Sequence, residues 1–578
     1  MTQSKIKYLI STLAATLLLA ACSESTKGKR TNTEQPQHTM LIEKDQAIML
    51  RDGVSVFADL FRPSDTSKQY PVIFTYGPYC KDLHFADFDP ITYSKSPVQN
   101  ENMVWETPDP ETWVKDGYIV VRIDQRGSGK SPGEVRILSS EFANDLYDVI
   151  EWLGTQPWSN GKVGMLGVSY YAVSQWIAAG MNPPHLAAII PWEGFTDAYR
   201  DAARQGGILS NTFLNGWYRG RVLAGQHGKG TADQAVLAQN LEIPNWPKAV
   251  AAARLATDPF WTNRFLPSAS NLSAIQIPVY SSGNWGGFSL HGKGNIEGFQ
   301  QVSSPHKWLQ MHTGNYVNSF YGKEGVADQK RFFDQFLKGT DNDMLSVPLI
   351  KLAIRYGGGD QYTWRYENEW PLARTLWTPF YLESHTGSLN ALKPSNASKV
   401  AYEEKTTTVT FLTTPFVENT EITGPIKLKL WVSSNTNDTD LFVSLKKIDS
   451  HGKDMVQVNT THTPGPVTKG WLRVSHRKLD SNRSKPYEPY LSHDEILPLT
   501  PGQVVPVEIE VWPTSMVFEA GTRLALVIGG TDDPSTDTFF HNDSADRTSS
   551  SLPSITTIWT GSNYNSHVLL PVIPNSVE

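Results

Sequence analysis

Short apolar runs that alternate with amphipathic segments constrain the fold of this chain more than any other feature. Each run ends in turn residues, as strands buried on both faces of a parallel sheet do. Residues 140–153 and 170–180 carry the apolar spacing of helices, and Gly180 closes the second. We therefore expect an α/β domain with a parallel sheet covered by helices. The runs are YPVIFTYG (70–77), GYIVVRID (117–124), VGMLG (163–167) and LAAIIPWEG (186–194).

The pattern changes twice along a chain that, at 578 residues, is too long for a single hydrophobic core. Periodicity weakens over 195–272, which we interpret as a helical cap inserted into the α/β domain. After about residue 370 strand follows strand, which predicts a separate β-sandwich of the jelly-roll type. The expected organisation is a signal peptide (1–21), a flexible tether (22–39), the first part of the α/β core (40–194), the cap (195–272), the second part of the core (273–365) and the β-sandwich (366–578).

The N-terminus carries the pattern of an exported protein. Lys5 and Lys7 precede a short apolar run over 9–19, and small residues lead to Cys22. Leu-Ala-Ala-Cys resembles the lipobox of bacterial lipoproteins, which implies that Cys22 is lipidated and anchors the protein to a membrane. In that family Ser23 favours the outer membrane, so we expect an extracytoplasmic location. The alternative is an ordinary signal peptide with an incidental cysteine.

Composition argues against several classes of partner. The formal net charge is −7 and no long basic run occurs, so a nucleic-acid surface is not expected. Histidines are scattered without H-E-x-x-H or paired cysteines, and we expect no metal or cofactor. GSGKS (127–131) mimics part of a phosphate-binding loop, but Asp124 stands where that loop needs glycine and Pro132 fits poorly in the helix that should follow.

Ser169 is the first candidate for chemistry. It lies between the strand at 163–167 and the helix at 170–180, as the serine of a nucleophile elbow does. That turn exposes the hydroxyl, and the helix N-terminus stabilises developing negative charge. Gly167 fits the G-x-S-x-G pattern, whereas Tyr171 occupies the last glycine position. Glycine and serine are also ordinary helix-entry residues, which is the alternative interpretation.

The surrounding residues resemble a known family. GVSYYAVSQW is similar to the elbow of the cocaine esterase, α-amino-acid ester hydrolase, glutaryl acylase and X-prolyl dipeptidyl aminopeptidase family. TYGPYCKD (75–82) and DQRGSGKSPGE (124–134) match two further family motifs in order. The resemblance implies an α/β-hydrolase domain with a helical cap and a C-terminal jelly roll. It also implies an oxyanion hole formed by the Tyr79 hydroxyl and the Tyr170 backbone N–H.

The remaining members of a catalytic triad depart from the family pattern. The family's acid follows the penultimate strand, where this chain has Gly287, and Tyr316 stands at the usual histidine position. A serine hydroxyl needs a base to become a strong nucleophile. We expect His312, at the end of the last core strand, to be that base, with His291 as the alternative.

For the acid we expect Glu193 in PWEG, at the tip of the strand that follows the nucleophile strand, with Asp197 as the alternative. The sequence thus predicts a hydrolase that cleaves ester or amide bonds of a small-molecule or peptide acyl substrate. A dipeptidyl peptidase of the X-Pro type is the alternative within enzymes. A non-catalytic, surface-displayed binding protein with a degenerate triad is the alternative outside them.

Overall fold

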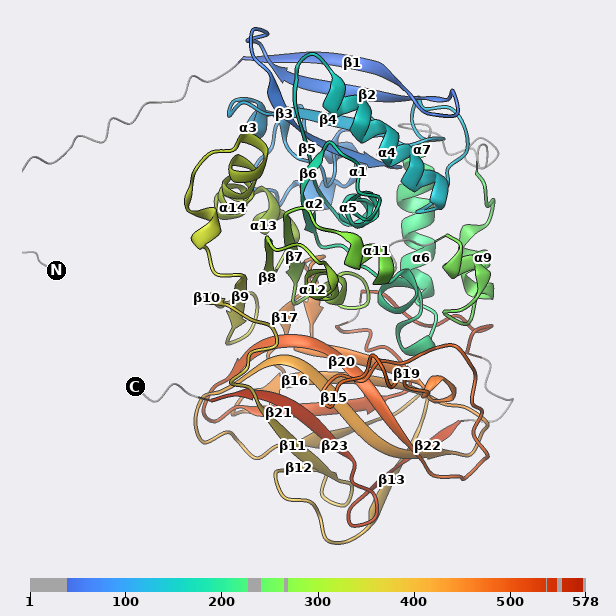
Figure 1. The fold of residues 1–578 in the computed structure, drawn as a ribbon. Helices are drawn as coiled ribbons and strands as arrows, with labels where there is room; N and C mark the ends of the chain where they lie inside the picture. The colour runs from blue at the N-terminus through green and yellow to red at the C-terminus, as the bar shows by residue number, and fades with distance from the viewer. Residues whose placement is uncertain (1–38, 227–240, 265–268, 537, 548–553, 575–578) are drawn as a thin grey trace, which may run out of the picture. The chain divides into compact units, whose positions relative to one another are not determined.

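The first ten strands of the described chain pair side by side in the order β1-β2-β4-β3-β5-β6-β7-β8-β9-β10 (Figure 1). Strands β3 to β9 run parallel, and antiparallel strands complete both edges. The four apolar runs form buried strands, which confirms the predicted parallel sheet. The strands are β1 (Met40–Met49), β2 (Ser55–Pro63), β3 (Tyr70–Gly77), β4 (Ile119–Asp124), β5 (Ser159–Val168), β6 (Leu186–Trp192), β7 (Val279–Asn284), β8 (Lys307–His312), β9 (Ile350–Arg355) and β10 (Tyr362–Glu367).

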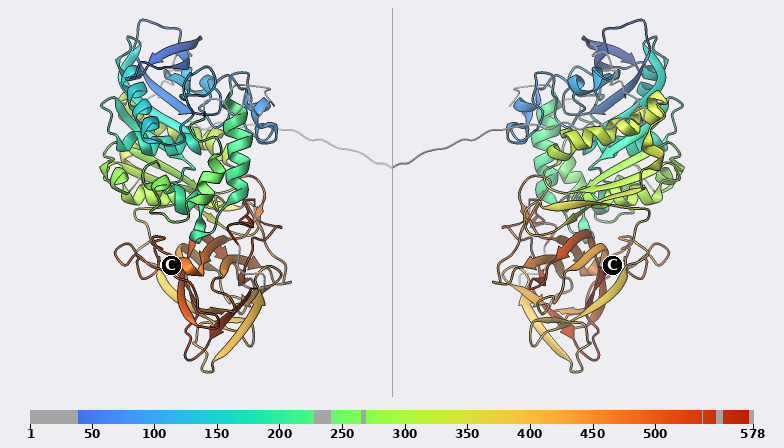
Figure 2. Two further views of the ribbon diagram at one scale, coloured as in Figure 1. Left: turned by 90° about the vertical axis from the view of Figure 1, so that its right-hand side faces the viewer. Right: turned by 90° about the vertical axis from the view of Figure 1, so that its left-hand side faces the viewer.

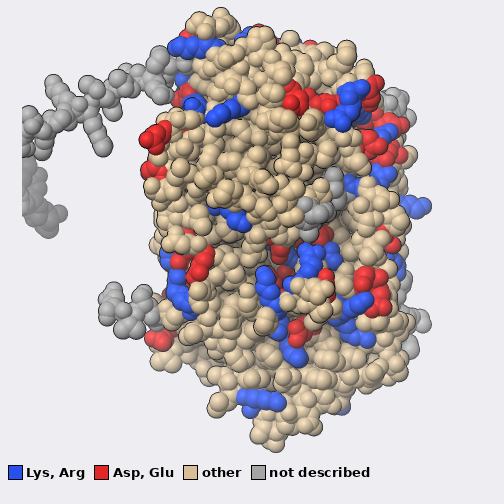
Figure 3. All heavy atoms as spheres, viewed as in Figure 1, with Lys and Arg blue, Asp and Glu red and all other residues tan. Residues whose placement is uncertain are grey.

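This computed structural model describes residues 39–226, 241–264, 269–536, 538–547 and 554–574. The expected signal peptide and Cys22 lie outside these residues. Within the described ranges, no helix has both the length and the apolar character needed to cross a membrane. On the face shown in Figure 3, acidic and basic side chains are interspersed.

Helices cover the sheet, as Figure 2 shows from two sides. The helices expected at 140–153 and 170–180 form α4 and α5. The Ser139 hydroxyl caps α4 by accepting a hydrogen bond from the Phe142 N–H at 3.2 Å. Almost every side chain of α5 is buried, so this helix lies inside the domain. The helices are α1 (Phe85–Phe88), α2 (Pro90–Tyr93), α3 (Pro110–Val114), α4 (Ser140–Thr155), α5 (Tyr170–Gly180), α12 (Gly292–Gln301), α13 (Tyr316–Tyr321) and α14 (Lys323–Phe333).

The segment between β6 and β7 folds into short helical pieces. Tyr199, Trp246 and Trp261 from this segment are buried and belong to the same hydrophobic core as the sheet. The segment that we interpret as a cap therefore packs onto the α/β domain. Its elements are η1 (Ala198–Ala203), η2 (Gln205–Gly207), α6 (Asn211–Trp217), η3 (Tyr218–Leu223), α7 (Ala224–Gln226), α9 (Trp246–Ala252), α10 (Pro259–Thr262) and α11 (Ala269–Ala274).

The C-terminal part is β-rich and has a hydrophobic core of its own, formed by residues between Leu382 and Leu570. Its long strands β15 and β20 pair antiparallel, as do β16 and β21. The jelly-roll order remains a prediction. The strands are β11 (Leu376–Glu383), β12 (Ser388–Asn390), β13 (Ser398–Glu403), β14 (Thr408–Leu412), β15 (Thr420–Ser434), β16 (Asp440–Ile448), β17 (Gln457–Val458), β18 (Pro464–Gly465), β19 (Thr468–Arg473), β20 (Val505–Phe518), β21 (Arg523–Gly529), β22 (Ile555–Thr560) and β23 (His567–Ile573).

Candidate active site

Ser169 occupies a strained turn between β5 and α5. Its backbone has φ 61° and ψ −117°, a left-handed conformation that non-glycine residues rarely adopt. Such strain is characteristic of functional turns, where the surrounding structure holds it. Gly167 is required beside it, because a Cβ there would lie 2.6 Å from the Tyr171 Cβ. The segment thus folds as the nucleophile elbow that its sequence predicts.

A histidine lies next to the Ser169 hydroxyl, and a glutamate lies behind the histidine. The Ser169 Oγ lies 3.1 Å from the His291 Nε2, within hydrogen-bond distance. The other ring nitrogen, Nδ1, lies 3.7 Å from the Glu193 Oε2. This second distance is slightly longer than a hydrogen bond, as is common for catalytic contacts before substrate binds. Serine, imidazole and carboxylate therefore stand in the order that activates a serine hydroxyl.

Glu193 directly follows β6 and is 1% exposed. Its backbone N–H donates to the Ser282 carbonyl at 2.7 Å, which fixes the strand tip against β7. The Asn284 side-chain amide donates to Oε1 at 3.0 Å, and the Thr460 hydroxyl donates to Oε2 at 2.6 Å. Both carboxylate oxygens are therefore held, and Oε2 is the oxygen that faces His291.

These contacts determine the charge of the site. Burial alone would raise the pKa of Glu193, but the nearby His291 and His312 and the Thr460 hydroxyl outweigh burial and hold this pKa below its usual value. Burial lowers the pKa of His312, against the opposing charge of Glu193. We therefore expect a charged Glu193 and a neutral His312 at neutral pH.

The structure contradicts the expectation that His312 would lie against Ser169. The His312 Nε2 lies 3.3 Å from the Glu193 Oε1 and 3.4 Å from the Ser319 hydroxyl. The reason is that His312 is still the last residue of β8, where its ring is held against Glu193 and Ser319, whereas Tyr316, four residues further along the chain, lines the cavity at Ser169. The chain after β7 turns back over the sheet end and brings His291 to the nucleophile instead.

The oxyanion candidates lie beside Ser169. The Tyr79 ring packs edge-on against Tyr170 and Tyr171, with centroids 5.9 and 5.5 Å apart. The Tyr79 hydroxyl accepts a hydrogen bond from the Trp217 Nε1 at 2.7 Å, so its own proton remains available to another acceptor. Burial raises the pKa of Tyr79 well above its usual value and keeps the hydroxyl neutral. The Tyr170 N–H, in the first turn of α5, has no intrahelical partner by helix geometry.

Two cavities meet at Ser169 and His291. The larger has a volume of about 580 Å³, and charged and aromatic side chains line it, among them Glu106, Arg221, Trp217 and Tyr316. The smaller has a volume of about 40 Å³ and an almost entirely apolar wall. Its lining includes Leu138, Phe195, Ala202, Leu214, Trp246 and Trp261. The hydroxyl thus opens onto one compact apolar space and one wide space with charged side chains in its wall.

Comparison with known proteins identifies the family. Residues 52–318 match the model of the X-Pro dipeptidyl-peptidase (S15) family, and residues 346–569 match that of the X-Pro dipeptidyl-peptidase C-terminal non-catalytic domain. A solved CocE/NonD family hydrolase from Staphylococcus aureus is 34% identical, with a TM-score of 0.84 over 93% of this chain and 94% of that chain. The chain belongs to the CocE/NonD family of hydrolases.

Other members and structural neighbours agree with this assignment. Cocaine esterase from a Rhodococcus species is 25% identical over 91% of this chain and 97% of the esterase. An α-amino-acid ester hydrolase shares the fold, with a TM-score of 0.69 at 17% identity over 95% of this chain and all of that chain. The resemblance drawn from the three sequence motifs is therefore confirmed, and the fold is the hydrolase fold of this family followed by a β-rich domain.

Two positions explain how this CocE/NonD chain differs from the family pattern. At Gly287, where the family has its acid, a Cβ would lie 3.1 Å from the Gly292 N–H nitrogen, so a side chain has little room. Tyr316, at the usual histidine position, lines the larger cavity. Asp197, the alternative acid, instead pairs with Arg200 at 2.8 Å. The carboxylate beside the histidine comes from β6 rather than β7.

Sequence reasoning missed Glu106, a buried carboxyl in the larger cavity. Its backbone has φ 61°, and its carbonyl accepts a hydrogen bond from Val168, the residue before the nucleophile, at 3.1 Å. Oε2 has no hydrogen-bond partner among the described residues. Burial raises the pKa of Glu106 well above its usual value, although Arg221 opposes the shift. Its only sequence signal is a lone acid in the apolar stretch MVWET.

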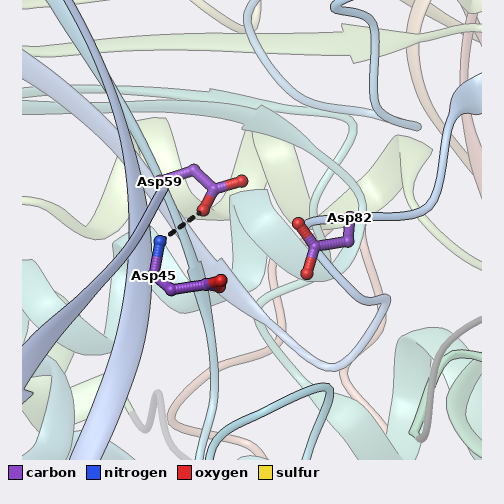
Figure 4. Close-up of side chains that lie close together, drawn as sticks. All are labelled: Asp45, Asp59 and Asp82. Atoms are coloured by element: carbon purple, nitrogen blue, oxygen red, sulfur yellow. Dashed lines mark hydrogen bonds between the residues drawn. The ribbon is translucent and has the colours of Figure 1, made fainter. Parts of the chain in front are cut away.

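Three aspartates surround Lys81 and support the loop that carries Tyr79. The carboxylates of Asp45, Asp59 and Asp82 gather at one point (Figure 4). The Lys81 ammonium lies 2.7, 2.9 and 3.0 Å from them, and Lys44 and Lys130 also pair with the cluster, so protein cations already balance its charge. The Lys81 backbone N–H donates to Asp124 at 2.6 Å. The second and third family motifs thus meet here, and their contacts fix the loop that carries the oxyanion candidate.

Proposed function

We propose that this protein is a serine hydrolase that cleaves carboxylic esters through an acyl-enzyme on Ser169. The observation that carries the proposal is the line from the Ser169 hydroxyl through His291 to Glu193, at 3.1 and 3.7 Å. Membership of a family of ester and peptide hydrolases supports it. His291 replaces His312 in the role of general base, and Glu193 keeps the role of acid.

Each residue has a defined part in the proposed reaction. His291 takes the Ser169 proton at Nε2 while the serine oxygen bonds to the ester carbonyl carbon. Glu193 orients the ring and stabilises the imidazolium that forms. The Tyr79 hydroxyl and the Tyr170 N–H donate to the oxyanion. His291 then protonates the departing alcohol, and water hydrolyses the acyl-enzyme by the same proton transfers in reverse order.

The two cavities suggest how a substrate divides between them. We assign the acyl group to the smaller cavity, because its wall is apolar. About 40 Å³ corresponds to roughly three waters at about 10–15 Å³ each, which suits an acyl group of a few carbons. The alcohol part would occupy the larger cavity. A dipeptidyl peptidase of the X-Pro type is the second candidate, because Glu106 offers this cavity a carboxyl that could receive a free amino terminus.

The location is also a proposal. We propose that Cys22 carries a lipid and holds the enzyme on a bacterial membrane, facing an extracytoplasmic space, with the outer membrane favoured by Ser23. The observation that supports it is the lipobox-like segment that ends at Cys22.

A fluorophosphonate probe and a small substrate panel test the function. Wild-type protein should be labelled, Ser169→Ala should not, and Ser174→Ala should be labelled normally, because among the described residues the Ser174 hydroxyl bonds only to a carbonyl of α5, at 2.9 Å. p-Nitrophenyl acetate to butyrate should be cleaved at least ten-fold faster than octanoate. Faster cleavage of glycyl-prolyl-p-nitroanilide would favour the peptidase. Absence of labelling together with absence of turnover would favour the binding protein instead.

A further inference from the structure

Glu193 accepts a hydrogen bond from a residue of the β-rich domain. Thr460 belongs to the turn between β17 and β18 in the β-rich domain, 267 residues from Glu193. Its hydroxyl donates to the Glu193 Oε2 at 2.6 Å, and the residue is 8% exposed. The segment around it matches the model described as a C-terminal non-catalytic domain.

We propose that Thr460 is a positioning residue for the catalytic acid, so that the β-rich domain completes the active site. This inference rests on the proposed function and extends it. Thr460 bonds to the same carboxylate oxygen that faces His291 Nδ1, whereas Asn284 bonds to the other oxygen. Two donors from different domains therefore fix the plane of the carboxylate.

The turn that carries Thr460 is itself fixed against the sheet end. The Thr460 N–H donates to the Gly286 carbonyl at 3.3 Å. A Cβ on Gly286 would lie 2.8 Å from the Val458 carbonyl oxygen, so glycine permits this close approach of two backbones. The Gly286 N–H in turn donates to the Asn284 side-chain oxygen at 2.8 Å. The two donors to Glu193 are thus linked by a short chain of hydrogen bonds.

The β-rich domain also holds the segment that carries His291. The Lys293 ammonium, two residues beyond His291, lies 2.8 Å from the Glu510 carboxylate of β20. On the other side, the Gln205 amide donates to the Ser289 carbonyl at 2.8 Å. His541 lies 2.9 Å from the same Gln205 side chain. The base and the acid therefore both depend on contacts that cross between the domains.

The size of the expected effect follows from the type of bond. A hydrogen bond to a buried charged group, when lost, corresponds to a rate change of about 10- to 100-fold. His291, His312 and, more distantly, Glu106 and Tyr316 are the titratable groups of the described residues that influence Glu193 or are influenced by it. Removal of the Thr460 hydroxyl withdraws one of the contacts that lower the Glu193 pKa.

The test compares Thr460→Val and Thr460→Ala with Thr460→Ser in the full-length protein. The first two should lower kcat and kcat/KM for p-nitrophenyl butyrate together by about 10- to 100-fold, with KM nearly unchanged. The acidic limb of the pH profile should move to higher pH, because a carboxylate that has lost this donor attracts the imidazolium proton more strongly. Thr460→Ser keeps the hydroxyl and should remain within about three-fold of wild type.

Thr423→Val is the matched control. The Thr423 hydroxyl also donates to a glutamate of the β-rich domain, Glu421, at 2.7 Å, but outside the site. Its kinetics should be those of wild type. If Thr460→Val and Thr460→Ala keep the wild-type rate and pH profile while Ser169→Ala is inactive, the inference is overturned and the proposed function stands. A wild-type protein without turnover or probe labelling would overturn both.

Discussion

Replacement of Glu193 by glutamine removes its charge while nearly preserving its shape. Glutamine has nearly the same shape, but its amide offers one acceptor oxygen in place of two, so it can accept only one of the hydrogen bonds that Asn284 and Thr460 donate, and it carries no charge to stabilise an imidazolium. Its amide can also donate to His291 Nδ1, which would force the ring proton onto the nitrogen that must accept from Ser169. Both effects act on the chemical step and leave the cavities intact.

The magnitude follows from the distance between the ring and the carboxylate. Two unit charges 3.7 Å apart, the separation of the His291 Nδ1 and the Glu193 Oε2, interact by about 4.5 kcal/mol at an effective dielectric constant of about 20. Because the imidazolium forms only as the serine attacks, the loss should appear in kcat. It corresponds to a decrease on the order of 10³-fold.

The assay is steady-state turnover of p-nitrophenyl butyrate, with thermal unfolding to check the fold. His312→Gln is the matched comparison, because His312 contacts the same carboxylate at 3.3 Å without touching Ser169, and it should stay within about ten-fold of wild type. Glu193→Gln with more than a tenth of wild-type activity would refute the reasoning. A His312→Gln variant as impaired as Glu193→Gln would return His312 to the role of base.

Three further predictions address other parts of the molecule. Tyr79→Phe should lower kcat by about 10²- to 10³-fold with little change in thermal stability, and unchanged ester turnover would exclude it from the oxyanion hole. Glu106→Gln should be more stable than wild type at pH 7 to 8 in urea unfolding. The pKa of Glu106 is raised in the folded protein, so the free energy of unfolding falls as the pH rises above the unfolded-state pKa of about 4.3. Glutamine does not titrate and removes this pH dependence. An equal pH dependence in both proteins would contradict this. Cys22→Ala should leave the membrane fraction, and its retention there would argue against a lipid anchor.

The sequence predicted the sheet well because its strands are buried on both faces and leave continuous apolar runs. It also located Ser169, since an elbow is a local structure whose strand, turn and helix adjoin in the chain. The base could not be located in this way. His291 reaches the nucleophile through the path of the chain after β7, and His312 is held at the end of β8 against Glu193 and Ser319, neither of which periodicity records.

Glu106 and Thr460 were missed for two different reasons. Glu106 is a single acid whose importance comes from burial and from the strained backbone beside β5. In the sequence Thr460 is an ordinary turn threonine, and only the packing of the β-rich domain against the α/β domain places it beside Glu193. Glu193 could be placed near the site from the sequence, and the structure has it beside His291, because the carboxyl ends of neighbouring parallel strands converge on one edge of the sheet.

The shift of the carboxylate from β7 to β6 affects how other members of this family should be judged. A relative with glycine and tyrosine at the places of Gly287 and Tyr316 would be counted as inactive if each position were scored separately. The spatial arrangement gives a different rule: such a chain should be assayed whenever a glutamate follows its sixth strand and a histidine lies a few residues beyond its seventh. Members that have neither the usual acid and histidine at those two places nor this glutamate and histidine are then the proper candidates for proteins that have lost catalysis.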